Sequence, residues 1–304
     1  MKKTLIVATR GGALAEVQTG IVISYLQKIH PDIEIRVKKI ASEGDKDRRT
    51  TLWELKETGF FTSLLEDALI AGQADAAVHS FKDLPTAIRK GLTIGAVLNR
   101  KFPEDCLVSA APIKTIDELP KGAKVGTSSL RRTVQLKRLR EDLQCVPIRG
   151  NVDTRLRKLQ QADSASADKF DAIVLARAGL ERLGLADKIS IVFDPGEFIP
   201  SPAQGALAVE IRADDSETRE LISKLDEKET RVETTAERLV FAALGCGCHA
   251  PAGVFARIQN DAITISAFNC DPDGKNYARA AVTGPVSNAE TLALSLAEKI
   301  RSGH

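Results

Sequence analysis

The sequence has few aromatic residues and almost no excess charge of either sign. Aromatic side chains make up 4% of its 304 residues, and the formal net charge is +2. Proteins that bind nucleic acids usually carry a clear basic excess for the phosphates and aromatic rings for base stacking. The composition therefore argues against a nucleic-acid partner.

Long apolar runs and a regular set of cysteines are missing as well. No run approaches the roughly 20 apolar residues that a membrane span requires, and the stretch from Thr4 to Ala8 is too short for a signal peptide. Five cysteines at irregular spacing are not typical of a disulfide framework. We therefore expect a cytoplasmic protein with free thiols and no membrane partner.

Short β-branched runs alternate with helical patterns through the first two thirds of the chain. This alternation favours parallel sheets with helices on both faces, and two such sheets fit before about residue 200. The predicted strands are 4–9, 33–40, 74–79, 92–98, 106–109, 123–126, 144–148, 170–176 and 206–211. The predicted helices among them are 14–29, 61–71, 128–142 and 152–162.

The order of elements changes after about residue 214. Two helical patterns, 214–225 and 229–244, precede two strand-like runs, 262–268 and 277–283, and a last helix near 288–301. This arrangement is typical of a separate α+β domain.

Basic residues follow the predicted strands where ligands bind in open α/β sheets. Three segments end a strand, and two of them also open a helix: 9–10, 126–132 and 149–155. Arginine pairs with carboxylate or phosphate through two hydrogen bonds, and free N–H groups at helix starts attract anions. The three segments predict one polyanionic ligand, whereas we interpret Arg138, Arg140 and Arg157 as ordinary surface charges. Because the chain has neither a Walker A sequence nor Gly-x-Gly-x-x-Gly after a strand, carboxylates are at least as plausible as phosphates.

An aspartate follows another predicted strand directly. The chain reads Val-His-Ser-Phe-Lys-Asp-Leu-Pro over 78–85, so Lys82 and Asp83 lie beside a turn that ends in proline. The position of Asp83 allows two interpretations. It is either a residue that caps a helix or forms a turn, or a carboxylate beside the ligand that stabilises a cationic intermediate.

The segment 244–253 contains two cysteines in a pattern that is typical of a reactive thiol. Its sequence, Leu-Gly-Cys-Gly-Cys-His-Ala-Pro-Ala-Gly, places glycines around both cysteines and predicts a tight exposed loop. Metal binding and disulfide exchange are alternatives, but the spacing fits neither well and no second pair of metal ligands appears. We interpret the loop as carrying a nucleophilic cysteine, while Cys106 and Cys270 adjoin strand-like runs and are expected to be buried.

These segments together resemble the porphobilinogen deaminase (hydroxymethylbilane synthase) family over nearly the whole chain. The matching motifs are ATR (8–10), AVHSFKDLP (77–85), GTSSLRR (126–132), RGNVDTRL (149–156), AGLERLGL (178–185), PAQGALAVE (202–210) and CHAPAG (248–253). The resemblance implies an α/β fold with two doubly wound, periplasmic-binding-protein-like lobes and a small C-terminal α+β domain. The expected domains are 1–99 with 202–220, 100–201, and 225–304.

The resemblance also implies an activity. Four porphobilinogen molecules would be joined head to tail with loss of ammonia to give hydroxymethylbilane, in tetrapyrrole biosynthesis. The cofactor would be a dipyrromethane held by a thioether to Cys248, and the enzyme would be a cytoplasmic monomer without a metal. A two-lobed anion-binding protein without catalysis is the alternative.

Site residues are carried over position by position. Asp83 matches the catalytic aspartate, which contacts pyrrole N–H groups and stabilises the azafulvenium cation formed when ammonia leaves. The residues expected to bind the cofactor and substrate are Arg10, Gln18, Ser80, Lys82, Thr127, Ser128, Ser129, Arg131, Arg132, Arg149, Gly150, Arg155 and Arg182. Three positions depart from the family pattern: Gly12 replaces a frequent serine, Thr58 a frequent lysine, and Cys246 a usual glycine.

Overall fold

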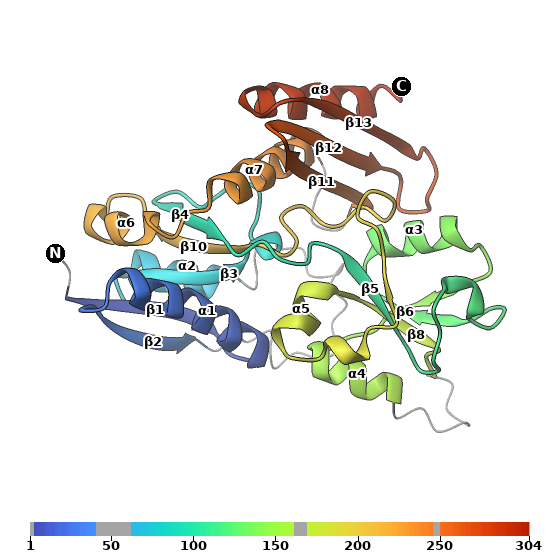
Figure 1. Ribbon diagram of the computed structural model, residues 1–304, viewed down its shortest axis with the longest axis horizontal. Coiled ribbons are helices and arrows are strands. Elements are labelled where there is room, and N and C mark those ends of the chain that lie inside the picture. The colour runs from blue at the N-terminus through green and yellow to red at the C-terminus, as the bar shows by residue number, and fades with distance from the viewer. Residues whose placement is uncertain (1–2, 41–61, 161–168, 246–249, 304) are drawn as a thin grey trace. The chain divides into compact units, whose positions relative to one another are not determined.

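The computed structural model describes residues 3–40, 62–160, 169–245 and 250–303. The chain divides into two compact units, Met1–Lys101 with Ala203–Thr235 and Phe102–Pro202 with Ala236–His304. The first unit contains one five-stranded sheet, and the second contains a five-stranded and a three-stranded sheet (Figure 1).

The sheet of the first unit has the strand order β2-β1-β3-β10-β4. Its strands are β1 (Thr4–Arg10), β2 (Glu34–Ile40), β3 (Ala76–Ser80), β4 (Leu92–Leu98) and β10 (Leu207–Arg212). Its helices are α1 (Ala13–Ile29), α2 (Ser63–Ile70) and α6 (Ser216–Ser223). Side chains alternate between the two faces: Leu5 and Val7 pack with residues of α1 and α6, whereas Ala8 packs with residues of α2. The sheet is therefore covered by helices on both sides.

The five-stranded sheet of the second unit repeats this plan with the order β7-β6-β8-β5-β9. Its strands are β5 (Asp105–Ser109), β6 (Lys124–Gly126), β7 (Gln144–Val146), β8 (Ala172–Ala176) and β9 (Ile191–Val192), and its helices are α3 (Leu130–Leu139), α4 (Val152–Gln160) and α5 (Arg177–Arg182). Val125 and Val174 pack with Leu136 of α3, while Ile173 faces the side covered by α4 and α5.

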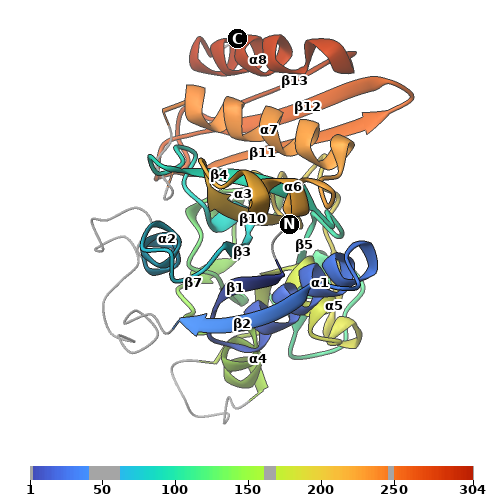
Figure 2. The same cartoon turned by 90° about the vertical axis from the view of Figure 1, so that its left-hand side faces the viewer.

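The C-terminal sheet is an antiparallel meander in which each strand pairs with the next. It consists of β11 (Ala252–Gln259), β12 (Ala262–Asn269) and β13 (Ala278–Pro285). Helix α8 (Ala289–Arg301) lies along β12 and β13 and buries Ala293, Leu296 and Ile300 (Figures 1 and 2). Helix α7 (Lys228–Ala243) contributes the buried Glu237, whose carboxylate accepts a hydrogen bond from the Ala256 N–H at 2.7 Å.

The predicted α/β class and the C-terminal α+β domain are confirmed, but the two five-stranded sheets are mixed, whereas the strand–helix alternation favours parallel ones. Strand β10 runs antiparallel to β3 and β4, and β5 runs antiparallel to β8 and β9. The predictions also missed β9, α5 and β11. The first two are too short to show a period, and β11 begins at Ala252-Gly253 directly after Pro251, residues that favour a loop. The proposed limits of three domains stay a prediction.

Cys106 and Cys270 are buried, as predicted, and the Cys270 thiol donates a hydrogen bond to the Pro251 carbonyl at 3.5 Å. Within the described ranges, none of the helices is both long and apolar enough to span a membrane.

Gly20 is exposed and Gly126 is closely packed, so replacing each by alanine tests how tightly the core around Gly126 is packed. Gly20 lies exposed in α1 with nothing within 4 Å of an added Cβ, so Gly20→Ala should raise the free energy of unfolding by about 0.5–1 kcal/mol. At Gly126 of β6 the added Cβ would lie 2.9 Å from the Ile173 Cγ2, so Gly126→Ala should lower it by about 1–3 kcal/mol. Urea unfolding measures both, and equal midpoints for the two variants would contradict the tight packing around Gly126.

Candidate active site

In the first unit, two predicted site residues lie where parallel strands end. Strands β1 and β3 are parallel neighbours, so Arg10 and Ser80, their last residues, lie at the same edge of the sheet. The buried Gln18 of α1 donates a hydrogen bond from Nε2 to the Ser80 Oγ at 2.7 Å. This bond ties the helix that follows β1 to the end of β3.

The chain after β3 makes a single 3₁₀ turn, Phe81–Asp83, that presents the catalytic candidate. Phe81 and Leu84 are buried in one apolar cluster, and the Phe81 N–H donates to the Ala206 carbonyl at 3.1 Å. Lys82 Nζ lies 3.2 Å from the Gln204 Oε1 and donates a hydrogen bond to it. Because the flanking side chains are anchored inside, the Asp83 carboxylate between them is left exposed.

In the second unit, the hydroxyl residues between β6 and α3 fix their own loop. Ser128 Oγ donates to the Ile148 carbonyl at 2.8 Å and accepts from the Ile148 N–H at 3.1 Å. Thr127 Oγ1 accepts from the Ser129 N–H at 3.2 Å. The one O–H of Ser128 is therefore used within the protein in this arrangement.

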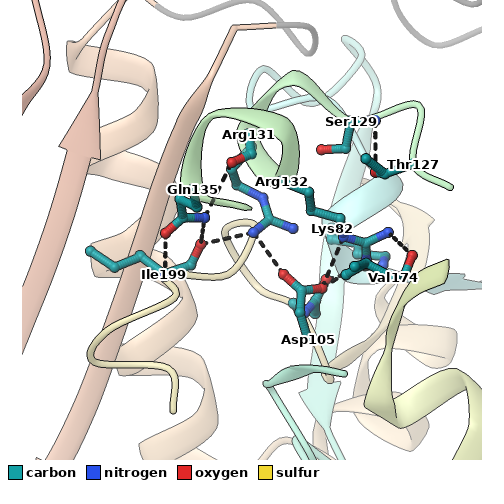
Figure 3. A network of polar contacts seen from close by, with 10 residues as sticks. Lys82, Asp105, Thr127, Ser129, Arg131, Arg132, Gln135, Val174 and Ile199 are labelled. Atoms are coloured by element: carbon teal, nitrogen blue, oxygen red, sulfur yellow. Dashed lines mark hydrogen bonds and ion pairs between the residues drawn. The ribbon is translucent and has the colours of Figure 1, made fainter. Parts of the chain in front are cut away.

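Arg131 and Arg132, the first arginines of α3, converge on the buried Asp105 at the start of β5 (Figure 3). Arg131 Nη1 lies 2.7 Å from Asp105 Oδ2, and Arg132 Nη2 lies 2.7 Å from Asp105 Oδ1. Asp105 is fully buried, and the two arginines are only 6% and 7% exposed. The three side chains together carry one net positive charge.

Backbone carbonyls complete the surroundings of these guanidinium groups. Arg131 Nη1 also donates to the Ile199 carbonyl at 2.8 Å, and Arg132 Nη1 donates to the Val174 carbonyl at 2.9 Å. Burial lowers the pKa of Arg131, but a guanidinium remains protonated at neutral pH. The arginines are thus held in place as cations before any ligand is considered.

The charge of Asp105 follows from its neighbours. Burial by itself would raise its pKa, but the positive charges of Arg131 and Arg132, and their hydrogen bonds, hold the pKa of this carboxyl well below its usual range. Asp105 is therefore ionised throughout the physiological pH range.

The segment before α4 brings in a further arginine. Gly150 has a φ of 110°, and an added Cβ would lie 2.5 Å from the Thr154 Cγ2, so the position requires glycine. The Gly150 carbonyl accepts a hydrogen bond from Arg155 Nε at 2.8 Å. Burial, together with the nearby charge of Arg132, lowers the pKa of Arg155 to about 10. Burial is the larger of these two causes, and the repulsion from Arg132 adds to it.

Two other predicted residues lie nearby in the chain. Arg149 precedes α4 and is partly buried. Arg182 ends α5, and burial lowers its pKa to about 10.

The structure thus collects the predicted residues into two groups, one in each unit. The first contains Arg10, Gln18, Ser80, Lys82 and Asp83, and the second contains Thr127, Ser128, Ser129, Arg131, Arg132, Arg149, Gly150, Arg155 and Arg182. Cys248, Cys246 and Thr58 lie outside the described residues. In the part of the chain that is described, no three acidic, histidine or cysteine side chains are grouped so as to hold a metal ion.

Sequence reasoning missed Asp105 and Gln204, the partners of Arg131, Arg132 and Lys82. Asp105 begins an apolar strand, and an acidic residue at that point is a weak signal that could have drawn attention to it. Gln204 lies 122 positions from Lys82, and no local pattern connects the two residues.

Comparison with known proteins identifies the family. Residues 5–220 match the family model described as porphobilinogen deaminase, dipyromethane cofactor binding domain, and residues 231–302 match the model of the porphobilinogen deaminase C-terminal domain. The chain belongs to the porphobilinogen deaminase family. It is 42% identical over 300 residues to the porphobilinogen deaminase of Pelotomaculum thermopropionicum, covering 99% of this chain and 94% of that one. It is 43% identical over 300 residues to that of Roseiflexus sp., covering 99% and 96%.

Among solved structures, the methionine-binding protein MetQ aligns with a TM-score of 0.45 and 13% identity, covering 73% of this chain and 89% of that one.

Family membership confirms the predicted activity and cofactor. The chain is a transferase that polymerises porphobilinogen in tetrapyrrole biosynthesis, and its cofactor is a dipyrromethane. A two-lobed binding protein without catalysis is accordingly not favoured. The match to the cofactor-binding domain covers both groups of site residues, whereas Cys248 falls within the match to the C-terminal domain.

Replacing Asp105 tests the buried ion triad. Asp105→Asn should lower the free energy of unfolding at pH 7 by about 3–5 kcal/mol, because two buried guanidinium groups lose their counter-charge. Since the folded-state pKa lies below the unfolded value of about 3.9, this contribution is present above about pH 4 and is lost as the pH falls. Urea unfolding between pH 7 and pH 3 should therefore show a flatter pH dependence in the variant than in the wild type.

Asp142→Asn is the matched control. Asp142 pairs with Arg140 at 2.6 Å near the surface, and this bond lowers the pKa of Asp142 to about 2. Water already screens that pair, so its loss should have a much smaller effect. Equal losses in the two variants would contradict a special contribution from burial of the triad.

Proposed function

We propose that the arginines of the second unit bind the carboxylates of the dipyrromethane cofactor and of the growing pyrrole chain. The supporting observation is the charge balance around α3: Arg131, Arg132 and Arg155 are partly or fully buried, and Asp105 is the carboxylate bound to the first two. A buried excess of positive charge is costly unless an anion offsets it. Porphobilinogen and dipyrromethane carry acetate and propionate groups that would supply this anion.

The residues present fit a polycarboxylate cofactor. Burial, and to a smaller extent repulsion from Arg132, lowers the pKa of Arg155, and a bound carboxylate would offset both effects by stabilising the charged guanidinium. Arg149 and Arg182 would add further forks for carboxylates, and the backbone around Ser129 would add N–H donors. When bound, the cofactor supplies a pyrrole ring with a free α-carbon, which serves as the primer.

In the first unit, Asp83 is proposed as the catalytic residue and Arg10, Gln18, Ser80 and Lys82 as the residues that bind and orient pyrrole rings around it. Loss of ammonia from the substrate leaves a cation, which the Asp83 carboxylate would stabilise. A unit charge about 4 Å away is worth about 1 kcal/mol in water but about 4 kcal/mol at an effective dielectric constant of about 20. Because Asp83 is exposed, the bound pyrrole rings themselves must exclude water for the larger value to apply.

The overall reaction is proposed to run four times. In each round a carbon–carbon bond forms between the free α-carbon of the terminal ring and the aminomethyl carbon of the next porphobilinogen. The carbon–nitrogen bond breaks, the α-carbon loses its proton, and ammonia leaves. The released product would be hydroxymethylbilane: the carbon–carbon bond that joins the four-ring chain to the cofactor would break, with one water supplying the hydroxyl group of the product and a proton to the cofactor's α-carbon. We further propose that the enzyme acts as a cytoplasmic monomer without nucleic-acid partners.

Cys248 is proposed as the point of covalent attachment through a thioether. The intact mass of the purified protein should exceed that of the bare chain by a two-ring pyrrole unit, and Cys248→Ala should lose this excess. Electrospray mass spectrometry of the undigested protein measures both.

Cys246→Ala is the matched control, because it removes the neighbouring thiol and should keep the adduct. The opposite result would move the attachment to Cys246, and an active wild-type protein of unmodified mass would refute covalent attachment.

Replacing Asp83 tests its role in turnover. Asp83→Ala should retain the covalent cofactor and bind porphobilinogen while the turnover rate falls by about a thousandfold, which corresponds to the loss of about 4 kcal/mol. Single-turnover kinetics with a measured substrate affinity separates the two effects. Asp214→Ala removes another exposed aspartate of the same unit and should leave turnover unchanged. A near-normal rate in Asp83→Ala would exclude this residue from the chemistry.

A further inference from the structure

Ile199 is held by both of its main-chain polar groups. The Ile199 N–H donates to the Gln135 Oε1 at 2.7 Å, and the Ile199 carbonyl accepts from the Gln135 Nε2 at 3.1 Å (Figure 3). Ile199 is fully buried and Gln135 is 4% exposed. The side-chain amide of Gln135 thus satisfies this buried backbone in the way that a neighbouring strand would.

The same carbonyl is bound by a residue of the proposed active site. Arg131 Nη1 donates to the Ile199 carbonyl at 2.8 Å, and Gln135 lies one helical turn after Arg131 in α3. Arg131 therefore takes its position from two partners, the Asp105 carboxylate and the Ile199 backbone.

The first residues of β11 also contact this backbone. The Val254 N–H donates to the Pro200 carbonyl at 3.1 Å. A Cβ added at Gly253 would lie 2.7 Å from the Ile199 carbonyl oxygen and 3.0 Å from the Pro200 carbonyl oxygen. Gly253 is thus required by the close approach of two backbones.

Apolar side chains also pack around Ile199. Ile199 shares one buried cluster with Val134 of α3, Phe268 of β12 and Cys270, and Phe255 of β11 packs against it. The backbone at 199–200 is therefore enclosed between α3 and the C-terminal sheet by hydrogen bonds and by apolar contacts.

We propose that Gln135 and Gly253 are positioning residues that fix the start of β11 relative to Arg131 through the Ile199–Pro200 backbone. The inference rests on the proposed attachment of the cofactor to Cys248, which precedes Gly253 by five residues. Five residues of chain span at most about 18 Å, so the anchor at Gly253 limits how far the attachment point lies from the arginines. Gln135 and Gly253 touch neither cofactor nor substrate in this scheme; they set the distance between the tether and the guanidinium groups.

The experiment uses Gln135→Met and Gly253→Ala in the full chain. Methionine keeps the volume of Gln135 but removes its hydrogen bonds to Ile199, and alanine forces the two backbones apart at residue 253. Intact-mass spectrometry gives the fraction of purified protein that carries the two-ring adduct, steady-state kinetics gives kcat and KM, and thermal unfolding reports stability.

Gly284→Ala is the matched control for Gly253→Ala. Gly284 lies in β13 of the same sheet, but its added Cβ would lie 3.0 Å from the Leu292 Cδ1, a side-chain end that can move. It should therefore keep the adduct and the kinetic constants of the wild type. Gln135→Glu keeps the acceptor for the Ile199 N–H and should recover part of the effect of Gln135→Met.

We expect Gln135→Met and Gly253→Ala each to lower the adduct fraction and to raise KM by about tenfold, because a displacement of the order of an ångström disturbs a site that needs exact placement. Unchanged adduct fraction and KM in folded variants, with only the melting temperature reduced, would overturn the proposal and leave a purely structural role. If one variant does not fold, the other and Gln135→Glu decide the question. Absence of the adduct from the wild type would instead refute the proposed attachment to Cys248, and this outcome differs from a loss of the adduct in the variants alone.

Discussion

Asp105 sits with its full negative charge between two buried guanidinium groups, and the chemistry of the second unit follows from that contact. Each buried ion by itself would cost several kcal/mol of desolvation, so neither the arginines nor the aspartate could occupy these positions alone. Together they leave one net positive charge held rigidly at the start of α3. A preorganised cation of this kind binds carboxylates without a further cost of ordering flexible side chains.

The two units carry complementary chemistry. The second unit concentrates buried cations, which suits a ligand rich in acetate and propionate groups. The first unit instead presents an exposed aspartate on a turn anchored by Phe81 and Leu84, with Lys82 bound to Gln204 beside it. In the proposed mechanism, residues of the second unit recognise the acidic pyrrole chain, and a residue of the first unit stabilises the cation formed at each step.

The backbone at Ile199–Pro200 contacts both α3, which carries the proposed binding arginines, and the start of β11. Gln135 and Arg131 of α3 donate hydrogen bonds to the Ile199 carbonyl, and Val254 of β11 donates one to the Pro200 carbonyl. Gly253 packs closely against both carbonyl oxygens. The glycine of the CHAPAG motif is explained by this contact and not by a turn, since the obstacle to a side chain there is a neighbouring carbonyl oxygen. A motif that was chosen for its cysteine therefore also contains a packing constraint.

The sequence alone was sufficient to predict the α/β class, most helices and strands, and the family. It also pointed to candidate site residues such as Asp83 and Arg131. These features could be predicted because hydrophobic spacing and short motifs are local properties of the chain. The antiparallel course of β5 and β10, the strand β11 and the partners of the arginines were decided by tertiary structure. Asp105 lies 26 positions from Arg131, and Ile199 lies 64 positions from Gln135. Such pairs are selected by the burial of charge and backbone groups in the folded core, and that burial has no counterpart in the local order of residues.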